Sequence, residues 1–260
     1  MTPGKTLQSL HAQVPLVHCI TNYVAMNIAA NVTLAAGASP AMLHAPQEVA
    51  EFVPMAGALT INIGTLSDTW VEAMMIAAQT AQARSVPWVL DPVAHFVTTY
   101  RAKVAKDLLA QRPSIVRGNA SEIIALAGGD GAGKGADSGD SVTDAQASAI
   151  DLASRTGCVV AVTGPVDFAT DGKRHFTVRG GSDLMPKVTA LGCSLTALVG
   201  AYAAVTSPLE ATAAALLHFS EAGERAARSC QGPGSFTAAF LDQLHALHPD
   251  DLDDGRMIWL

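Results

Sequence analysis

The stretch Val188–Ala197 places small and polar residues at the predicted start of a long apolar helix. Its first turn contains Ala190, Leu191, Gly192 and Cys193. The first N–H groups of a helix lack intrahelical partners and lie at the positive end of the helix dipole. The backbone N–H groups of these four residues are therefore suited to bind a phosphoryl group while it is transferred. We expect the same field to lower the pKa of the Cys193 thiol. A small core residue is the alternative for Cys193, and this segment alone favours that alternative.

Charged residues follow two other predicted strands. Asp91 comes directly after the apolar run 86–90, where a carboxylate can hold Mg²⁺ through water, although Asp-Pro also simply ends strands. Arg117 ends the next strand, where a guanidinium suits phosphate, and Glu122 stands five residues later as a second candidate metal carboxylate. Asn119 and Glu122 also have the spacing of a helix capping box, and the two roles do not exclude each other.

Two further segments resemble phosphate-binding elements. Thr163-Gly164 ends another strand, where a hydroxyl beside a flexible backbone can approach a nucleotide phosphate, or the pair simply forms a turn. The segment 128–135 has the GxxxxGK spacing of a phosphate loop, but Gly135 stands where that motif needs Ser or Thr. It also follows a helical run instead of a strand. We expect a surface loop there.

The elements that position these residues alternate between strands and helices. Strands are predicted at 14–20, 39–44, 58–63, 86–92, 113–119 and 158–164, and a hairpin around Asp171-Gly172 over 166–178. Helices are predicted at 23–37 and 68–84, the second with Asp68 as N-cap, and over most of the last third. This alternation predicts an α/β fold of three layers, with a mostly parallel central sheet flanked by helices and ligands bound beyond the carboxyl ends of its strands. No linker divides residues 1–260, so we expect one domain.

Composition excludes several classes of protein. Hydrophobic residues make up 49% of the 260 residues and charged residues 15%, which indicates a packed interior. The net charge of −7 argues against a nucleic-acid partner. The most apolar run, 190–205, is shorter than the roughly 20 residues of a membrane helix. The N-terminus lacks a secretory pattern and the four cysteines lack CxxC spacing, so we expect a cytoplasmic protein with reduced thiols.

Taken together, these motifs resemble the hydroxyethylthiazole kinase family, within the ribokinase-like superfamily. The resemblance extends over almost the whole chain and is carried by the following segments: HCITN (18–22), GASPAM (37–42), NIGTL (62–66), LDPV (90–93), RGNASEI (117–123), GKGADS (133–138) and AVTGPVD (161–167). It implies ATP- and Mg²⁺-dependent phosphorylation of the hydroxyl of 4-methyl-5-(2-hydroxyethyl)thiazole. It also implies a homotrimer with sites near the subunit interfaces.

The resemblance assigns roles to individual residues. It implies Asp91 and Glu122 at Mg²⁺, and Arg117 and Thr163 at ATP. It implies Met42, Asn22 and Ala190 at the thiazole, with the N–H groups of residues 190–193 around the phosphoryl oxygens. Cys193 matches the family cysteine that stands where related sugar kinases have an aspartate base.

Two departures from the family pattern concern glycine. The family usually has TGxGC where this chain has Thr189-Ala190-Leu191-Gly192-Cys193. We expect Ala190 to replace glycine readily if the backbone there keeps a negative φ. After Asp91 the family usually has DPVGxG, whereas this chain has DPVAHF, a change that could narrow the pocket or slow turnover.

Two rival functions remain open from the sequence. One is another kinase of the superfamily, of pyrimidine or pyridoxal type, or a nucleotide-using hydrate dehydratase; these usually keep aspartate at the position of Cys193. The other is a thiazole- or nucleotide-binding protein without catalysis, a possibility that the lost glycines leave open.

Overall fold

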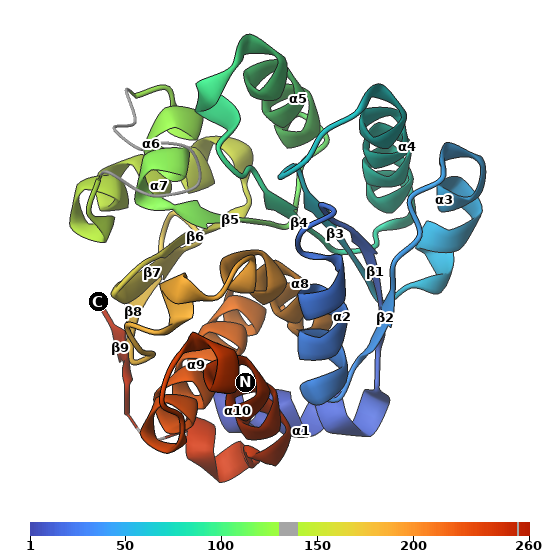
Figure 1. The fold of residues 1–260 in the computed structure, drawn as a ribbon. Helices are drawn as coiled ribbons and strands as arrows, with labels where there is room; N and C mark the ends of the chain where they lie inside the picture. Colours follow the sequence, from blue (N-terminus) through green and yellow to red (C-terminus); the bar gives the residue numbers. More distant parts are fainter. Residues whose placement is uncertain (130–139, 254) are drawn as a thin grey trace.

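The computed structural model describes residues 1–129, 140–253 and 255–260. Its centre is one nine-stranded sheet in the order β2-β1-β3-β4-β5-β6-β7-β8-β9 (Figure 1). The strands from β2 to β6 are parallel, and β7, β8 and β9 continue the sheet antiparallel. Their bounds are β1 (Leu16–Ile20), β2 (Ser39–Ala41), β3 (Ala58–Asn62), β4 (Trp88–Asp91), β5 (Ile115–Asn119), β6 (Val159–Thr163), β7 (Val166–Thr170), β8 (His175–Arg179) and β9 (Met257–Trp259).

Helices cover both faces of the sheet and complete three layers (Figure 1). One layer holds α3 (Pro46–Phe52), α4 (Asp68–Arg84), α5 (Thr99–Leu109), α6 (Ala120–Ala127) and α7 (Val142–Thr156). The other holds α1 (Pro3–Gln13), α2 (Met26–Ala35), α8 (Leu191–Ala203), α9 (Pro208–Ser229) and α10 (Pro233–Ala246). Each layer buries its own apolar cluster against the sheet. The three-layer α/β fold with a mostly parallel central sheet, expected from the sequence, is therefore confirmed.

Alternation along the strands assigns the polar strand ends to one face. Val89 belongs to the apolar cluster shared with α8, and Leu90 to the opposite cluster. Because successive side chains of a strand point to opposite faces, Asp91 points toward α8. Asn62 is the register partner of Asp91 on the neighbouring parallel strand, so it points the same way. The same register brings the end of β5 alongside β4.

Differences from the predicted elements are small and local. The N-cap of α4 is Ser67, whose hydroxyl accepts from the Trp70 N–H, so Asp68 is the first helical residue and the expected cap was wrong by one position. The helix expected at 23–37 is shorter, because residues 22–25 form a turn held by the Asn22 side chain. The third strand of the antiparallel part, β9, was not predicted. The phosphate-loop pattern beyond Gly129 lies outside the described residues.

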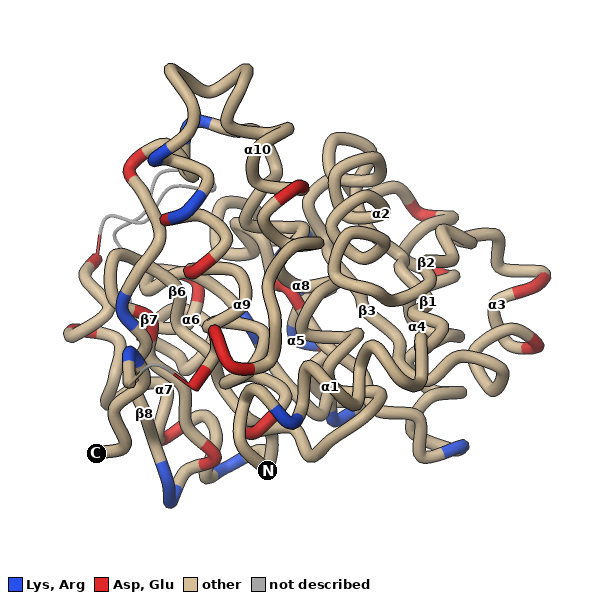
Figure 2. The backbone as a smooth tube through the Cα atoms, turned by 90° about the horizontal axis from the view of Figure 1, so that it is seen from below, with Lys and Arg blue, Asp and Glu red and all other residues tan. Residues whose placement is uncertain are grey.

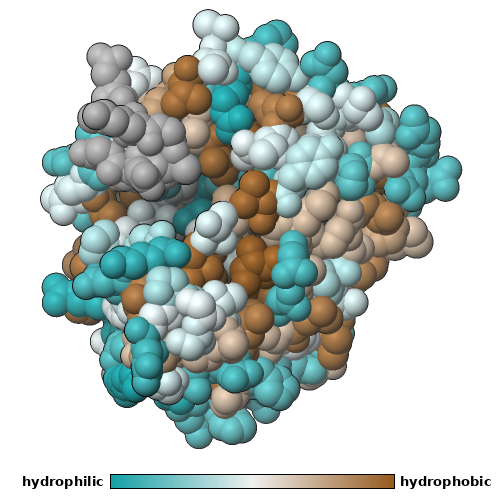
Figure 3. Space-filling model, in the orientation of Figure 1, coloured by the Kyte–Doolittle hydropathy of each residue, from teal (hydrophilic) through white to brown (hydrophobic). Residues whose placement is uncertain are grey.

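The surface mixes residue types. Lys and Arg alternate with Asp and Glu around the described backbone (Figure 2). On the face seen in Figure 3, apolar residues gather toward the middle and polar residues toward the rim. Among the helices of the described ranges, each falls short of the length and apolar character that crossing a membrane requires.

Candidate active site

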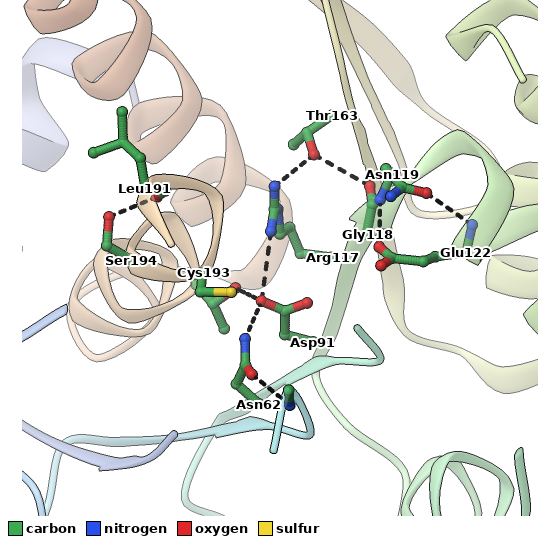
Figure 4. A network of polar contacts seen from close by, with 12 residues as sticks. Asn62, Asp91, Arg117, Gly118, Asn119, Glu122, Thr163, Leu191, Cys193 and Ser194 are labelled. Carbon is green, nitrogen blue, oxygen red and sulfur yellow. Dashed lines mark hydrogen bonds and ion pairs between the residues drawn. The ribbon is translucent and has the colours of Figure 1, made fainter. Parts of the chain in front are cut away.

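A chain of polar contacts runs along the carboxyl edge of the parallel strands (Figure 4). Asn62 Nδ2 donates to Asp91 Oδ2 at 2.7 Å, and Arg117 Nη1 lies 3.4 Å from the same oxygen. Arg117 Nη2 donates to Thr163 Oγ1 at 2.7 Å. Asn62, Asp91 and Thr163 end β3, β4 and β6. Arg117 is the third of the five residues of β5, two positions before the strand end at which the sequence placed it. The four strands are neighbours in the sheet. The fold thus joins residues from about a hundred positions of sequence into one site, as the strand-end argument predicted.

Asp91 is the centre of this chain. Its side chain is fully buried, and Oδ2 accepts a third hydrogen bond from Thr196 Oγ1 of α8 at 2.7 Å. Burial raises the pKa of Asp91, although the charge of Arg117 and the hydrogen bonds from Thr196, Asn62 and Arg117 act in the opposite direction. The second oxygen, Oδ1, is buried without a partner among the described residues, and so is Arg117 Nε. A buried carboxylate oxygen and a buried guanidinium N–H without partners indicate that ligands belong here.

Glu122 serves as both cap and site carboxylate. Its Oε2 accepts from the Asn119 N–H at 2.8 Å and Asn119 Oδ1 accepts from the Glu122 N–H at 2.9 Å, which confirms the capping box. Its Oε1 accepts from the Ala94 N–H at 2.9 Å. Burial and then the charge of Asp91 raise the pKa of Glu122. Both oxygens are therefore oriented by backbone amides before any ligand binds.

The carboxylates fit a magnesium ion held largely by water and phosphate. The described residues contain no cluster of three His, Cys, Asp or Glu side chains that could enclose a metal. Asp91 nevertheless offers a buried free oxygen, and Mg²⁺ in nucleotide sites is usually bound by one or two carboxylates together with waters and phosphate oxygens. The donor set present here is of that kind.

The N-terminus of α8 lies against Arg117. A methyl group added to Gly192 would lie 3.4 Å from Arg117 Nη2, and Gly192 itself is exposed. The Leu191 N–H already donates to the Val188 carbonyl at 3.3 Å, so it is less available than expected. The amides of Ala190, Gly192 and Cys193 have no hydrogen-bond partner in the described structure. Two of these, at Gly192 and Cys193, combine the positive end of the helix with a nearby guanidinium.

The expectation of a lowered pKa for Cys193 was wrong. Burial raises the pKa of its thiol to about 11, and the negative charge of Asp91 adds to the effect. Asn22 Nδ2 donates to Cys193 Sγ at 3.6 Å, but this contact and Arg117 do not compensate. The cost of placing a thiolate in a desolvated position beside a carboxylate exceeds the help of the helix dipole. Cys193 is therefore a protonated thiol at neutral pH.

We expect Cys193 to react slowly with iodoacetamide at about pH 7.5. A pKa of about 11 leaves roughly 300-fold less thiolate than an ordinary cysteine has at that pH, and only the thiolate reacts. Because the pKa is raised, the rate should increase about tenfold per pH unit through the alkaline range. Peptide mass spectrometry of a time course measures it, with the half-buried Cys230 as internal reference. Faster labelling of Cys193 than of Cys230 at neutral pH would contradict the assignment.

The acceptor side of the site begins next to Cys193. Asn22 Nδ2 also donates to Asn62 Oδ1 at 2.8 Å, which links the segment after β1 to the carboxylate chain. Gly64 leaves room for this amide, since a Cβ there would lie 2.5 Å from Asn22 Nδ2. Met42 follows β2, the neighbour of β1, and is half-buried. Asn22 and Met42 thus lie at the same sheet edge as Cys193.

Each of the two departures from the family pattern includes one alanine on left-handed backbone, whereas Phe96 has no positive φ. Ala190 has φ 59° and Ala94 has φ 48°. The condition under which Ala190 would replace glycine readily is therefore not met, because an L-residue in this region costs roughly 1–2 kcal/mol. Both alanines thus lie in a conformation that glycine adopts without strain.

Three site residues were not singled out from the sequence: Asn62, Thr196 and Arg101. Asn62 had a usable signal, because it ends a strand as Asp91 does. Thr196 is the hydroxyl in an apolar helical run, a weaker signal. Arg101 had none, since its partners are backbone carbonyls of distant loops.

Comparisons with a family model and with individual relatives point to the same family. The model of the hydroxyethylthiazole kinase family matches residues 7–250. A protein of Roseobacter denitrificans named hydroxyethylthiazole kinase is 64% identical over 252 residues, which is 97% of this chain and 98% of that protein. One of the same name from Gemmatimonas aurantiaca is 60% identical over 260 residues, covering 100% of this chain and 94% of that protein.

Solved structures agree with this relationship. A hydroxyethylthiazole kinase protein from Pyrococcus horikoshii superposes with a TM-score of 0.92 at 37% identity, covering 99% of this chain and 98% of that one. Pyridoxal kinase from Staphylococcus aureus in complex with ADP gives a TM-score of 0.64 at 16% identity, covering 82% and 88%, and shares the fold alone. With a family model spanning most of its length and relatives at this identity, the chain belongs to the hydroxyethylthiazole kinase family.

Proposed function

We propose that this protein transfers the γ-phosphoryl group of ATP to the primary alcohol of 4-methyl-5-(2-hydroxyethyl)thiazole, in the supply of thiamine. The observation that carries the proposal is Asp91, a buried carboxylate with one oxygen fixed by three donors and the other without a partner. Arg117 links it to the open amides of α8. Family membership supplies the substrate, as the names of the relatives print it.

The positions of the residues support the following roles. Arg117 and Thr163 bind phosphate oxygens, and the amides of Gly192 and Cys193 stabilise negative charge on the transferring group. Asp91 and Glu122 would hold Mg²⁺, and the ion would supply positive charge that neutralises the phosphates. Asn22, Met42 and Ala190 border the acceptor alcohol. Little proton removal is needed early in a loose transition state, so Cys193 acts chiefly as a neutral neighbour of the hydroxyl.

We further propose that one domain, residues 1–260, assembles as a homotrimer in the cytoplasm with its sites near subunit interfaces. Support for the assembly comes from exposed apolar side chains on and before α2, of which Tyr23 and Val24 directly follow Asn22. Tyr23, Val24 and Leu34 are 68%, 56% and 57% exposed. Sedimentation equilibrium measures the subunit number.

An ADP-release assay tests the proposed activity. Purified protein is incubated with Mg²⁺–ATP and one alcohol at a time: hydroxyethylthiazole, a hydroxymethylpyrimidine or pyridoxal. We expect ADP formation that depends on the thiazole alcohol, with the phosphate ester identified by mass spectrometry. Turnover with pyridoxal or the pyrimidine alone would favour another kinase of the superfamily. Thiazole binding without ADP at any Mg²⁺ concentration would favour a non-catalytic protein.

A further inference from the structure

Arg101 joins the two loops that follow β3 and β4. Arg101 lies in the first turn of α5, and its guanidinium donates only to backbone carbonyls. Nη2 donates to Ile63 O at 2.7 Å and also contacts Val93 O, and Nη1 donates to Gly64 O at 3.3 Å. Nε donates to Ala94 O at 3.1 Å. The fork therefore spans both loops.

No carboxylate lies within ion-pair distance of Arg101 in the part of the chain that is described. The side chain is half-buried, and the nearest acidic influence on it comes from Glu122. A cation in this position contributes by saturating carbonyls and by facing Glu122 at longer range. Arg101 therefore acts on the site of Glu122 and does not form a surface ion pair with the residues that the structure describes.

The peptide groups on both sides of Ala94 connect Arg101 to Glu122. The Ala94 carbonyl accepts from Arg101 Nε, while the Ala94 N–H donates to Glu122 Oε1 at 2.9 Å. Between them Ala94 has φ 48°, a conformation that alanine adopts only when its surroundings impose it. A glycine would adopt it without such help.

An arginine is suited to this task. Its planar fork reaches carbonyls of two loops at once, whereas a lysine ammonium is a single point of charge. Without the fork, we expect Ala94 to relax toward negative φ, which turns its N–H away from Glu122. The carboxylate would then lose one of the two amides that orient it.

We propose that Arg101 is a positioning residue for nucleotide binding, holding Ala94 in its left-handed conformation so that Glu122 stays oriented. The role of Glu122 at Mg²⁺–ATP rests on the proposed function. We call the contacts of Arg101 with the carbonyls of Ile63, Gly64, Val93 and Ala94 the Arg101 clamp. The proposal is specific to a chain with alanine at position 94, because a glycine there would adopt the left-handed conformation without the clamp.

The test measures Mg²⁺–ATP binding by isothermal titration calorimetry without any acceptor alcohol. Arg101→Lys, which keeps the charge but loses the fork, should weaken binding about tenfold, the lower end of effects seen when outer partners of metal ligands are removed. Adding Ala94→Gly to Arg101→Lys should restore most of the affinity. Thermal unfolding of each ligand-free variant verifies folding, and Arg101→Gln replaces the lysine variant if the latter does not fold.

Ser85→Gly is the matched control. It relieves a left-handed residue at the end of α4, outside the proposed site, and Ser85 makes no contact with Arg101. In the Arg101→Lys background it should leave the weakened binding as it is. Wild-type affinity in the Arg101 variant, or equal recovery by both glycine substitutions, would overturn the proposal.

The outcome is separable from that of the proposed function. Binding is measured without the thiazole, so a protein that binds Mg²⁺–ATP but transfers no phosphoryl group still tests the clamp. If wild-type protein bound no Mg²⁺–ATP, both the nucleotide site and the clamp's role in it would fall. If binding and transfer were normal but insensitive to Arg101, only the clamp would fall.

Discussion

Asp91→Asn is expected to lower kcat/KM for phosphoryl transfer by about 10³-fold, in the upper range for removing one preorganised electrostatic group. The amide can present its oxygen to Asn62, Thr196 and Arg117, so the hydrogen bonds at that position persist. The negative charge that would attract Mg²⁺ is lost. Steady-state ADP release over a range of Mg²⁺ concentrations measures the effect, and thermal unfolding verifies the fold.

Cys193→Ala is the comparison for this variant. Because burial keeps the thiol protonated, Cys193 contributes little as a base, and we expect a loss below about 10²-fold, at the bottom of the range for general-base catalysis. The ordering of the two variants is the decisive result. Complete inactivity of Cys193→Ala together with near wild-type activity of Asp91→Asn would show that the roles are assigned wrongly.

Arg117→Met is expected to destabilise the fold by about 3 kcal/mol, because it leaves the Asp91 charge buried without its cation. Arg117 is 9% exposed and Asp91 fully buried, so water cannot readily replace the guanidinium. For a chain of this size the loss corresponds to a lowering of Tm by roughly 6–12 °C. Activity should fall as well, because Arg117 lies beside the N-terminus of α8, where the phosphate oxygens are proposed to bind.

A double variant separates these two effects. Adding Asp91→Asn to Arg117→Met removes both charges, so stability should recover in part while activity stays lost. Tm values of the four proteins in this cycle measure the coupling. Strictly additive losses of stability would mean that the 3.4 Å contact between Arg117 and Asp91 carries no net interaction.

The capping box at Asn119 and Glu122 shows what local sequence can predict. Side chains three positions apart reach each other's backbone amides without any tertiary partner, and the structure has both bonds. The second bond to Glu122, from Ala94, depends on packing of the loop after β4 against the first turn of α6. It could not be read from spacing.

Cys193 and Ala190 show where local reasoning failed. At a helix start, the dipole alone predicts a reactive thiol. The pKa depends instead on how much water the folded chain removes around the sulfur and on the carboxylate placed beside it. Likewise, the φ of Ala190 depends on where α8 must begin to face Arg117.

The amino-acid sequence by itself determined the alternation of strands and helices, the three-layer fold, the strand ends that carry Asp91 and Thr163, and the place of Arg117 in the strand between them. Periodicity and strand-end position are local properties, so they survive without coordinates. Only the tertiary structure decided which oxygens are satisfied, the protonation of Cys193, and the placement of Arg101 against two loops. These depend on desolvation and on contacts between residues distant in the chain, and no spacing along the sequence encodes them.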